Sequence, residues 1–149
     1  MTTFLRFPFR LTIVAAIVAS IGLLDSFYLT LQHYIGFPTV CLVANGCAIV
    51  LTSSYAILFG VSAALLGVLY YSALLLLLLR ALETRRIIFL LLFGCMSVFG
   101  FLVSAWFVYL QLVVLSAICS YCMISAASSL LLFVFSVWLI INYRFTHYE

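Results

Sequence analysis

The stretch CSYCMISAASSLLLFVFSVWLII occupies residues 119–141 and contains no charged side chain. A transmembrane helix needs about 20 mainly apolar residues, because the hydrocarbon core of a bilayer is about 30 Å thick. Three further apolar runs of similar length occupy Leu11–Leu31, Ala56–Leu79 and Ile87–Leu110. Across the chain 69% of the residues are hydrophobic and 6% are charged, whereas about a quarter of a soluble domain is charged. The sequence therefore predicts an all-α integral membrane protein, a bundle of four transmembrane helices.

The bundle is expected to form one domain, residues 1–149, because the chain shows two prolines, no internal repeat and no low-complexity tract. The first run is interpreted as a retained helix, since its apolar length exceeds the roughly 7–15 residues of a signal-peptide core. The third and fourth runs merge through LQLVVLSAIC, residues 110–119, where Gln111, Ser116 and the cysteines suggest a turn.

The basic residues predict the orientation of the bundle. All six are arginines, and none lies in the predicted loop Gln32–Tyr55 or in the turn between the third and fourth runs. They are Arg6, Arg10, Arg80, Arg85, Arg86 and Arg144. Because positive charge marks the cytoplasmic side, both termini are expected to be cytoplasmic and the loop exterior, that is, periplasmic or luminal. The net charge of +3 follows from this topology and gives no indication of nucleic-acid binding.

Four of the five cysteines fall on the predicted exterior side. Cys41 and Cys47 lie in the loop, and Cys119 and Cys122 lie at the exterior end of the fourth run. Cys95 lies within the third run, where a buried cysteine commonly serves as a small apolar residue. Structural disulfides would explain the four exterior cysteines, since disulfides persist in that compartment. A zinc site of four thiolates fits poorly with the gap between Cys41 and Cys47. The remaining interpretation is two redox pairs.

The spacing of the second pair favours redox chemistry. Positions three apart lie on one face of a helix, close enough for a strained and reducible disulfide between Cys119 and Cys122. The pair is also predicted to lie at a helix N-terminus, where the partial positive charge stabilises a thiolate. The thiolate is the species that attacks a disulfide or a quinone, and a purely structural disulfide would not need this placement.

Three motifs resemble the vitamin K epoxide reductase family, whose members are quinone-linked membrane thiol oxidoreductases. GLLDSFYLTLQHY, residues 22–34, is similar to the family's G-x-x-x-S-x-Y-L-T-x-x-H. GCAIVLTSSYAILFG, residues 46–60, follows Cys41 and is similar to C-x-x-V-x-x-S-x-Y-A-x-x-x-G. CSYC at residues 119–122 is the third motif, and the three motifs follow one another in the order found in the family. The resemblance extends from about Ile21 to Ser125.

The resemblance implies a role for each cysteine. Cys41 and Cys47 would be a loop pair that exchanges electrons with an exterior thiol protein of thioredoxin fold. Because no thioredoxin-like sequence follows the fourth run, this partner is expected to be a separate protein. Cys47 would then pass electrons to Cys119 through a transient mixed disulfide, and Cys122 would face a membrane quinone. Cys122 lies one helical turn deeper than Cys119, so it is expected to be less accessible to water-soluble reagents.

The resemblance also implies a quinone pocket. Ser53 matches a family serine that supports the loop or ligand, and Tyr55, Tyr121 and Ala63 are expected to line the pocket. The quinone would be of the menaquinone, ubiquinone or phylloquinone type, and no metal is expected. Animal members carry a tyrosine where this chain has Ala126, and many members carry asparagine or proline where it has Ser62 and Ala63.

Two alternatives stay open: a vitamin K quinone or epoxide reductase, and a non-catalytic four-span protein with structural disulfides. Asp25 and His33, near the exterior end of the first run, are candidates for proton handling.

Overall fold

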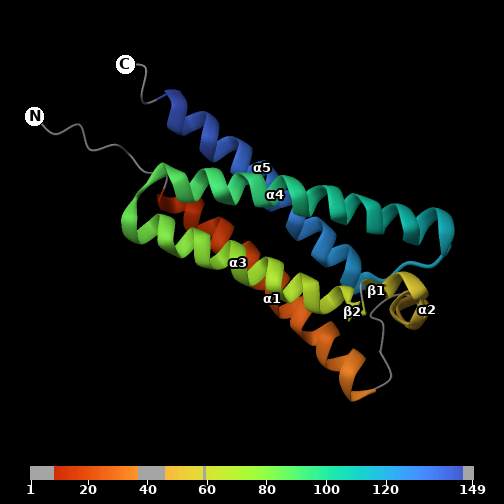
Figure 1. Cartoon of the computed structure of the whole chain (residues 1–149). Coiled ribbons are helices and arrows are strands. Elements are labelled where there is room, and N and C mark those ends of the chain that lie inside the picture. The colour runs from red at the N-terminus through yellow and green to blue at the C-terminus, as the bar shows by residue number, and fades with distance from the viewer. Residues whose placement is uncertain (1–8, 37–45, 59, 146–149) are drawn as a thin grey trace, which may run out of the picture.

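Four long helices form the protein. A computed structural model describes residues 9–36, 46–58 and 60–145. These residues contain four helices long and apolar enough to cross a membrane: α1 (Phe9–Ile35), α3 (Ala63–Thr84), α4 (Ile87–Tyr109, continued to Val114) and α5 (Ser120–Phe145). Figure 1 shows them running alongside one another, with the short elements at one end. The predicted four-helix membrane bundle is confirmed, and the single-domain assignment stays a prediction.

α1 packs between α3 and α5, and α4 covers the other side of these two helices. The buried face of α1 is made of small residues at helical spacing: Thr12, Ala15, Ala19, Gly22 and Ser26. In lipid, where neighbouring chains are as apolar as the solvent, helices associate mainly through such close packing. Gly22 shows the effect, because a Cβ at this position would lie 2.5 Å from the Cζ atom of Tyr71 on α3.

The outer surface of the bundle is apolar. Leu24 on α1, Leu76 on α3 and Phe99 on α4 are each more than 60% exposed, which would be costly in water over so large an area. Helices satisfy their own backbone hydrogen bonds and can therefore face hydrocarbon directly. The chain is an integral membrane protein.

The second span begins later than predicted. Residues 56–62 do not belong to it: η1 (Ser54–Ala56) leads into β1 (Ile57–Leu58), which pairs antiparallel with β2 (Val61–Ser62). Gly60 turns the hairpin with φ of +81°, a conformation that glycine adopts without steric cost. Ser62 then caps α3, because its Oγ accepts a hydrogen bond from the Leu65 N–H. The prediction that this span starts at Ala56 is wrong, since an apolar composition suits a hairpin as well as a helix.

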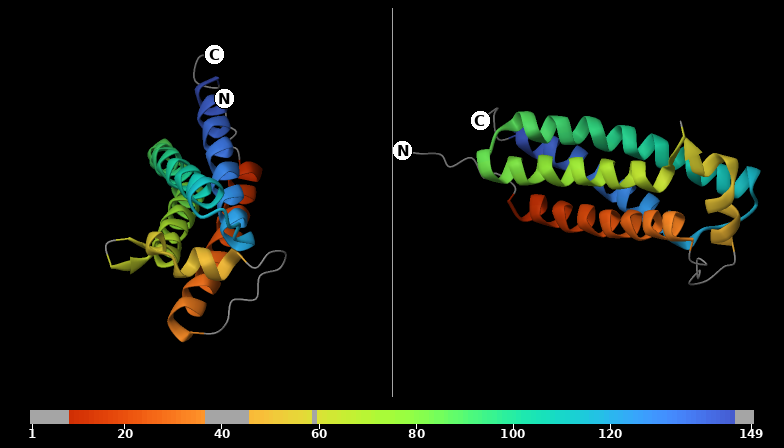
Figure 2. Two further views of the ribbon diagram at one scale, coloured as in Figure 1. Left: turned by 90° about the vertical axis from the view of Figure 1, so that its right-hand side faces the viewer. Right: turned by 60° about the horizontal axis from the view of Figure 1, so that its bottom comes forward.

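The predicted loop Gln32–Tyr55 is also more ordered than expected. α1 continues to Ile35, and the short helix α2 (Gly46–Thr52) follows within the loop. Figure 2 shows α2 lying across the end of the bundle, close to the start of α5.

The connection between α4 and α5 is a π-helical turn, η2 (Leu110–Val114). It ends where the Leu115 N–H donates to the Leu110 carbonyl, and Ser116 then reverses the chain with φ of +47°. The turn predicted from Gln111 and Ser116 is confirmed. α2 and this turn share one end of the bundle, while the start of α1, the α3–α4 connection and the end of α5 share the other (Figure 1). The described arginines Arg10, Arg80, Arg85 and Arg86 belong to this second end.

Candidate active site

Cys119 immediately precedes α5, and two hydrogen bonds fix its position. Its backbone N–H donates to Oε1 of Gln111 over 3.0 Å, and its Sγ accepts the Cys122 N–H over 3.3 Å. The sulfur thus occupies the place of an N-cap oxygen, which satisfies one of the free N–H groups of a first helical turn.

This cap favours the thiolate of Cys119. A hydrogen bond from the Cys122 side chain lowers the pKa of Cys119, and the backbone N–H groups of Cys122 and Tyr121 lower it further. Burial and the negative charge of Asp25 act in the opposite direction, and the net shift of the pKa is downward. Cys119 lies just outside the fourth span, Ser120–Ile141, at the point where the helix dipole also stabilises negative charge.

α2 brings Cys47 to the same place. Cys47 and Cys119 are both fully buried, and they pack in one cluster with Val50 and Ala117. Gly46 allows this approach, because a Cβ there would lie 2.5 Å from the Ile118 carbonyl oxygen. Cys47 is disulfide-bonded, whereas Cys119 and Cys122 are free thiols. Cys41 lies outside the described residues.

The two thiols of the helix pair lie in different surroundings, and their access to water-soluble reagents stays a prediction. Cys119 is 0% exposed because α2 covers it, while Cys122 is partly exposed and borders a cavity.

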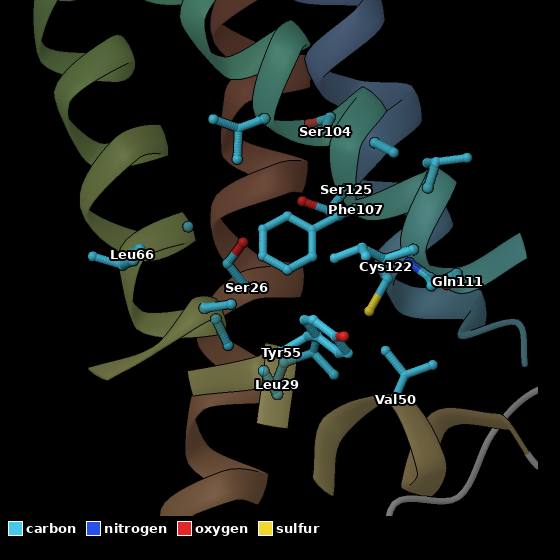
Figure 3. Close-up of a pocket in the computed structure, with 18 of the residues that line it drawn as sticks. Ser26, Leu29, Val50, Tyr55, Leu66, Ser104, Phe107, Gln111, Cys122 and Ser125 are labelled. Atoms are coloured by element: carbon cyan, nitrogen blue, oxygen red, sulfur yellow. The ribbon is translucent and has the colours of Figure 1, made fainter. Parts of the chain in front are cut away.

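The cavity has a volume of about 550 Å³ and is lined mainly by apolar side chains of α1, α3, α4 and α5. Figure 3 shows the Cys122 sulfur pointing into it, toward Tyr55 and Val50. Ser53, Tyr55 and Ala63, three of the predicted pocket residues, also line it. Its volume lies within the range of about 300–1,000 Å³ that is usual for small-molecule sites.

Several of the polar groups around this cavity are already engaged. The Ser53 hydroxyl donates to the Val50 carbonyl over 2.7 Å, so it holds the end of α2. The Tyr71 hydroxyl donates to the Ser125 carbonyl over 2.7 Å and thereby ties α3 to α5. Ala126 lines the cavity with a methyl group only.

Two residues proposed from the sequence lie elsewhere. Tyr121 is not among the described residues lining the cavity, and its ring packs against Tyr28 with centroids 5.2 Å apart. His33 is exposed near the end of α1, with its ring edge against Tyr34.

Gln111 belongs to the site, although its sequence context predicted only a turn. Gln111 is 2% exposed, lines the cavity and holds Cys119. Its isolation as a polar residue in an apolar run was the only available signal. Within the described part of the chain, no group of three or more His, Cys, Asp and Glu side chains could hold a metal ion.

Comparison with known families gives one match. The model of the vitamin K epoxide reductase family matches residues 13–137, which include α2, α3 and α4 and most of α1 and α5. None of the curated proteins compared with the chain matches it.

Proposed function

The chain belongs to the vitamin K epoxide reductase family, and on this premise we propose that it is a quinone-linked thiol–disulfide oxidoreductase. Membership makes it a membrane redox enzyme related to vitamin K epoxide reductase. The proposal adds the electron path: an exterior thioredoxin-fold thiol protein is oxidised by the pair Cys41 and Cys47, and the pair Cys119 and Cys122 passes the electrons to a membrane quinone. The product is a disulfide in the partner.

The observation that supports this path is the placement of three sulfurs. Cys47 and Cys119 share a buried cluster, and Cys122, one helical turn on from Cys119, borders the cavity. A thiolate at Cys47 can therefore attack Cys119 from α2, while Cys122 contacts whatever occupies the cavity. A pair of structural disulfides gives no reason for one sulfur to border an apolar cavity.

Each transfer between the pairs is an attack by a thiolate on a disulfide sulfur, through a mixed disulfide. A partner thiolate opens the loop disulfide, and Cys47 then opens the bond between Cys119 and Cys122. Cys122 leaves as the thiol nearest the cavity, and Cys119 is held in a mixed disulfide with Cys47. Attack of Cys41 on Cys47 then closes the loop disulfide and releases Cys119 as the stabilised thiolate at the cap of α5. A disulfide at Cys47 beside two free helix thiols is what this transfer would leave.

The residues around the cavity fit a quinone. The lining is mostly apolar, as an aromatic ring and an isoprenoid chain require, and Cys122 supplies a sulfur. A bound quinone would accept two electrons and two protons. Tyr55 and Ala63 contribute surface to this cavity, while Ser53 holds α2 in place.

The arginines support the proposed orientation of the bundle. The described arginines belong to the end of the bundle opposite α2, and positive charge favours the cytoplasmic side. The cysteines would then face the periplasm or lumen, where a thioredoxin-fold partner meets them.

The decisive test uses the purified chain in lipid vesicles with one quinone at a time. Reduced thioredoxin-fold protein is the donor, and disulfide formation and quinone reduction are followed together; vitamin K epoxide is included as a competing acceptor. We expect oxidation of the partner to be matched by quinone reduction.

In Cys122→Ala, quinone reduction should be lost while a Cys47–Cys119 mixed disulfide accumulates on non-reducing gels. Cys95→Ala, which changes an exposed thiol on α4 outside the site, should behave like the wild type. Retained quinone turnover in Cys122→Ala would overturn the proposal.

A further inference from the structure

Asp25 is a carboxyl group within α1 that the electron path does not use. Its Oδ2 is buried and makes no hydrogen bond within the described residues. Among the described residues, the ion pair that the structure shows is Arg80–Glu83, which lies at the opposite end of the bundle from Asp25. Because a charge or polar group is costly to bury without a partner, an unpaired carboxyl at this depth calls for a function.

The neighbours of Asp25 on α1 show which helix it faces. Gly22 and Tyr28, three residues before and after it, lie on the same side of the helix. The Tyr28 ring packs against Tyr121, in the first turn of α5. Asp25 is therefore directed toward the start of α5.

The contact of Gly22 gives the depth of Asp25 along α5. The ring of Tyr71 packs against Gly22, and its hydroxyl donates to the Ser125 carbonyl. Tyr28, on one side of Asp25, thus contacts α5 at Tyr121, and Gly22, on the other side, is linked through Tyr71 to α5 at Ser125. Cys122 lies between these two levels, so the carboxyl is at the height of the thiol pair.

The charge of Asp25 reaches both thiols. It interacts electrostatically with Cys119 and Cys122, and also with Tyr121 and Tyr71. Within the described part of the chain, these four groups interact with Asp25, and Tyr28, three positions further along α1, is the titratable side chain on the same side of its own helix. A carboxylate and a thiolate repel one another in a medium of low dielectric constant, so ionisation of one favours protonation of the other.

We propose that Asp25 is the proton acceptor of the Cys119–Cys122 thiol pair. This rests on the proposed function, because it assigns the protons of that same oxidation. When the pair is oxidised, two S–H bonds break, one S–S bond forms and two electrons pass to the quinone. The proton of Cys122 moves to the Asp25 carboxylate and then leaves, and both thiol protons finally reside on the reduced quinone or in water.

The test compares Asp25→Asn with the wild type by two measurements on the full chain in lipid nanodiscs. The first is the ultraviolet absorbance of thiolate against pH, taken as the difference from a variant lacking Cys119 and Cys122. The second is the rate of quinone reduction with dithiothreitol as donor. Loss of the negative charge should let thiolate form at lower pH. Loss of the proton acceptor should nevertheless slow quinone reduction, by roughly 100-fold, as is typical when a proton-transfer group is removed.

The opposite directions of these two changes distinguish the proposal from its alternatives. If Asp25 only influenced thiolate formation, the rate would rise with the thiolate fraction, and the proposal would be overturned. An unchanged thiolate titration in Asp25→Asn would also overturn it. Glu83→Gln removes an exposed carboxyl that pairs with Arg80 and should leave both measurements unchanged.

A second variant separates proton exchange from packing. Asp25→Glu keeps a titratable carboxyl, so its rate should lie nearer the wild type than that of Asp25→Asn. An equal loss in both variants would assign Asp25 a packing role and overturn the proposal. If the wild type reduced no quinone at all, the proposed function would fail, whereas the thiolate titration would still show whether the charge of Asp25 is coupled to the thiol pair.

Discussion

The sulfur of Cys119 shows how one residue combines a structural and a chemical role. As the cap of α5 it accepts the Cys122 N–H, and the same contacts lower the pKa of its thiol, the hydrogen bond from the Cys122 side chain being the largest cause. A lowered pKa means that the thiolate persists at pH values where an ordinary cysteine is protonated. At neutral pH Cys119 therefore has a larger thiolate fraction than a free cysteine.

This gives a pH prediction. In Cys122→Ala the side-chain donor is lost, so the pH at which the Cys119 thiolate forms should rise toward that of an ordinary cysteine. The absorbance of thiolate against pH, measured as the difference from the variant that lacks both cysteines, checks it. Tyr109→Phe, on an exposed residue of α4, is the control and should not move the midpoint. A midpoint that stays or falls in Cys122→Ala would contradict the cap argument.

At the residue scale, the sequence predicted the chemistry of the cysteines better than it predicted the surroundings of each residue. Spacing and position suffice to place Cys119 and Cys122 at a helix N-terminus, because both are properties of a single segment. The burial of Cys119 depends on α2, and the packing of Tyr121 on Tyr28 depends on α1. Such contacts between distant segments leave no periodic signal in the sequence.

At the scale of elements, the π-helical turn η2 matters because it orients Gln111. The Gln111 side chain reaches the N–H of Cys119, eight residues later, and its backbone carbonyl accepts the N–H of Ala117. Widened turns of this kind are frequent at functional sites. Here the turn connects the end of α4 to the start of α5 and to the thiol pair.

Gln111→Leu should therefore destabilise the protein by about 1–3 kcal/mol, the usual cost of a buried N–H left without its acceptor. Unfolding in mixed detergent micelles measures this, and the rate of quinone reduction should fall because Cys119 is no longer fixed. Leu112→Ala changes an exposed residue in the same turn and should alter both the free energy of unfolding and the rate of quinone reduction less than Gln111→Leu does. Equal stability of Gln111→Leu and the wild type would show that the side-chain bond does not hold α5.

The second element-scale prediction concerns α2. Gly46→Val places side-chain atoms where the Ile118 carbonyl lies, and a backbone group cannot move aside as a side chain can. α2 should shift from the start of α5, which separates Cys47 from Cys119 and uncovers the latter. Oxidation of the protein partner should slow, and direct reaction of Cys119 with dithiothreitol should become faster. Ile49→Ala, an exposed residue of α2, is the matched control. If both rates changed in the same direction, α2 would not be the cover of Cys119.

Run length predicted the spans because lipid imposes a minimum number of apolar residues. It failed at residues 56–62, where a hairpin and a helix start have the same composition. The local signals are the positive φ of Gly60 and the cap at Ser62, and these identify the boundary only once the backbone is known.

For the whole molecule, the number of spans could be predicted and the arrangement of the helices could not. Residues facing lipid and residues facing other helices are equally apolar in a membrane bundle, so hydrophobic periodicity does not show that α1 lies between α3 and α5. The orientation of the bundle can be predicted, because it depends on the distribution of the arginines between the two sides of the membrane and not on how the helices pack.

This asymmetry of the arginines predicts the topology. A fluorescent reporter fused after Glu149 should be active, and an exported phosphatase at the same point inactive, because the distribution of the arginines predicts that side to be cytoplasmic. A phosphatase fused after Ser116, at the α2 end of the bundle, should be active. Phosphatase activity after Glu149 would invert the orientation and place the cysteines in the cytoplasm.

The last prediction treats the two cysteine pairs as one path. On the proposed path a protein partner delivers its electrons through the loop pair, because Cys119 is buried beneath α2. Dithiothreitol is small and can enter at the helix pair, through the partly exposed Cys122 or when α2 shifts. Cys41→Ala and Cys47→Ala should therefore lose oxidation of the protein partner but keep part of the dithiothreitol-driven quinone reduction. Cys119→Ala and Cys122→Ala should lose both activities, because the sulfur at the cavity then lacks its resolving partner or is itself absent.

If all four variants were equally inactive with dithiothreitol, the loop pair and the helix pair would not act one after the other in electron transfer. A single site needing all four sulfurs at once would then describe the molecule, with α2 as part of its catalytic core.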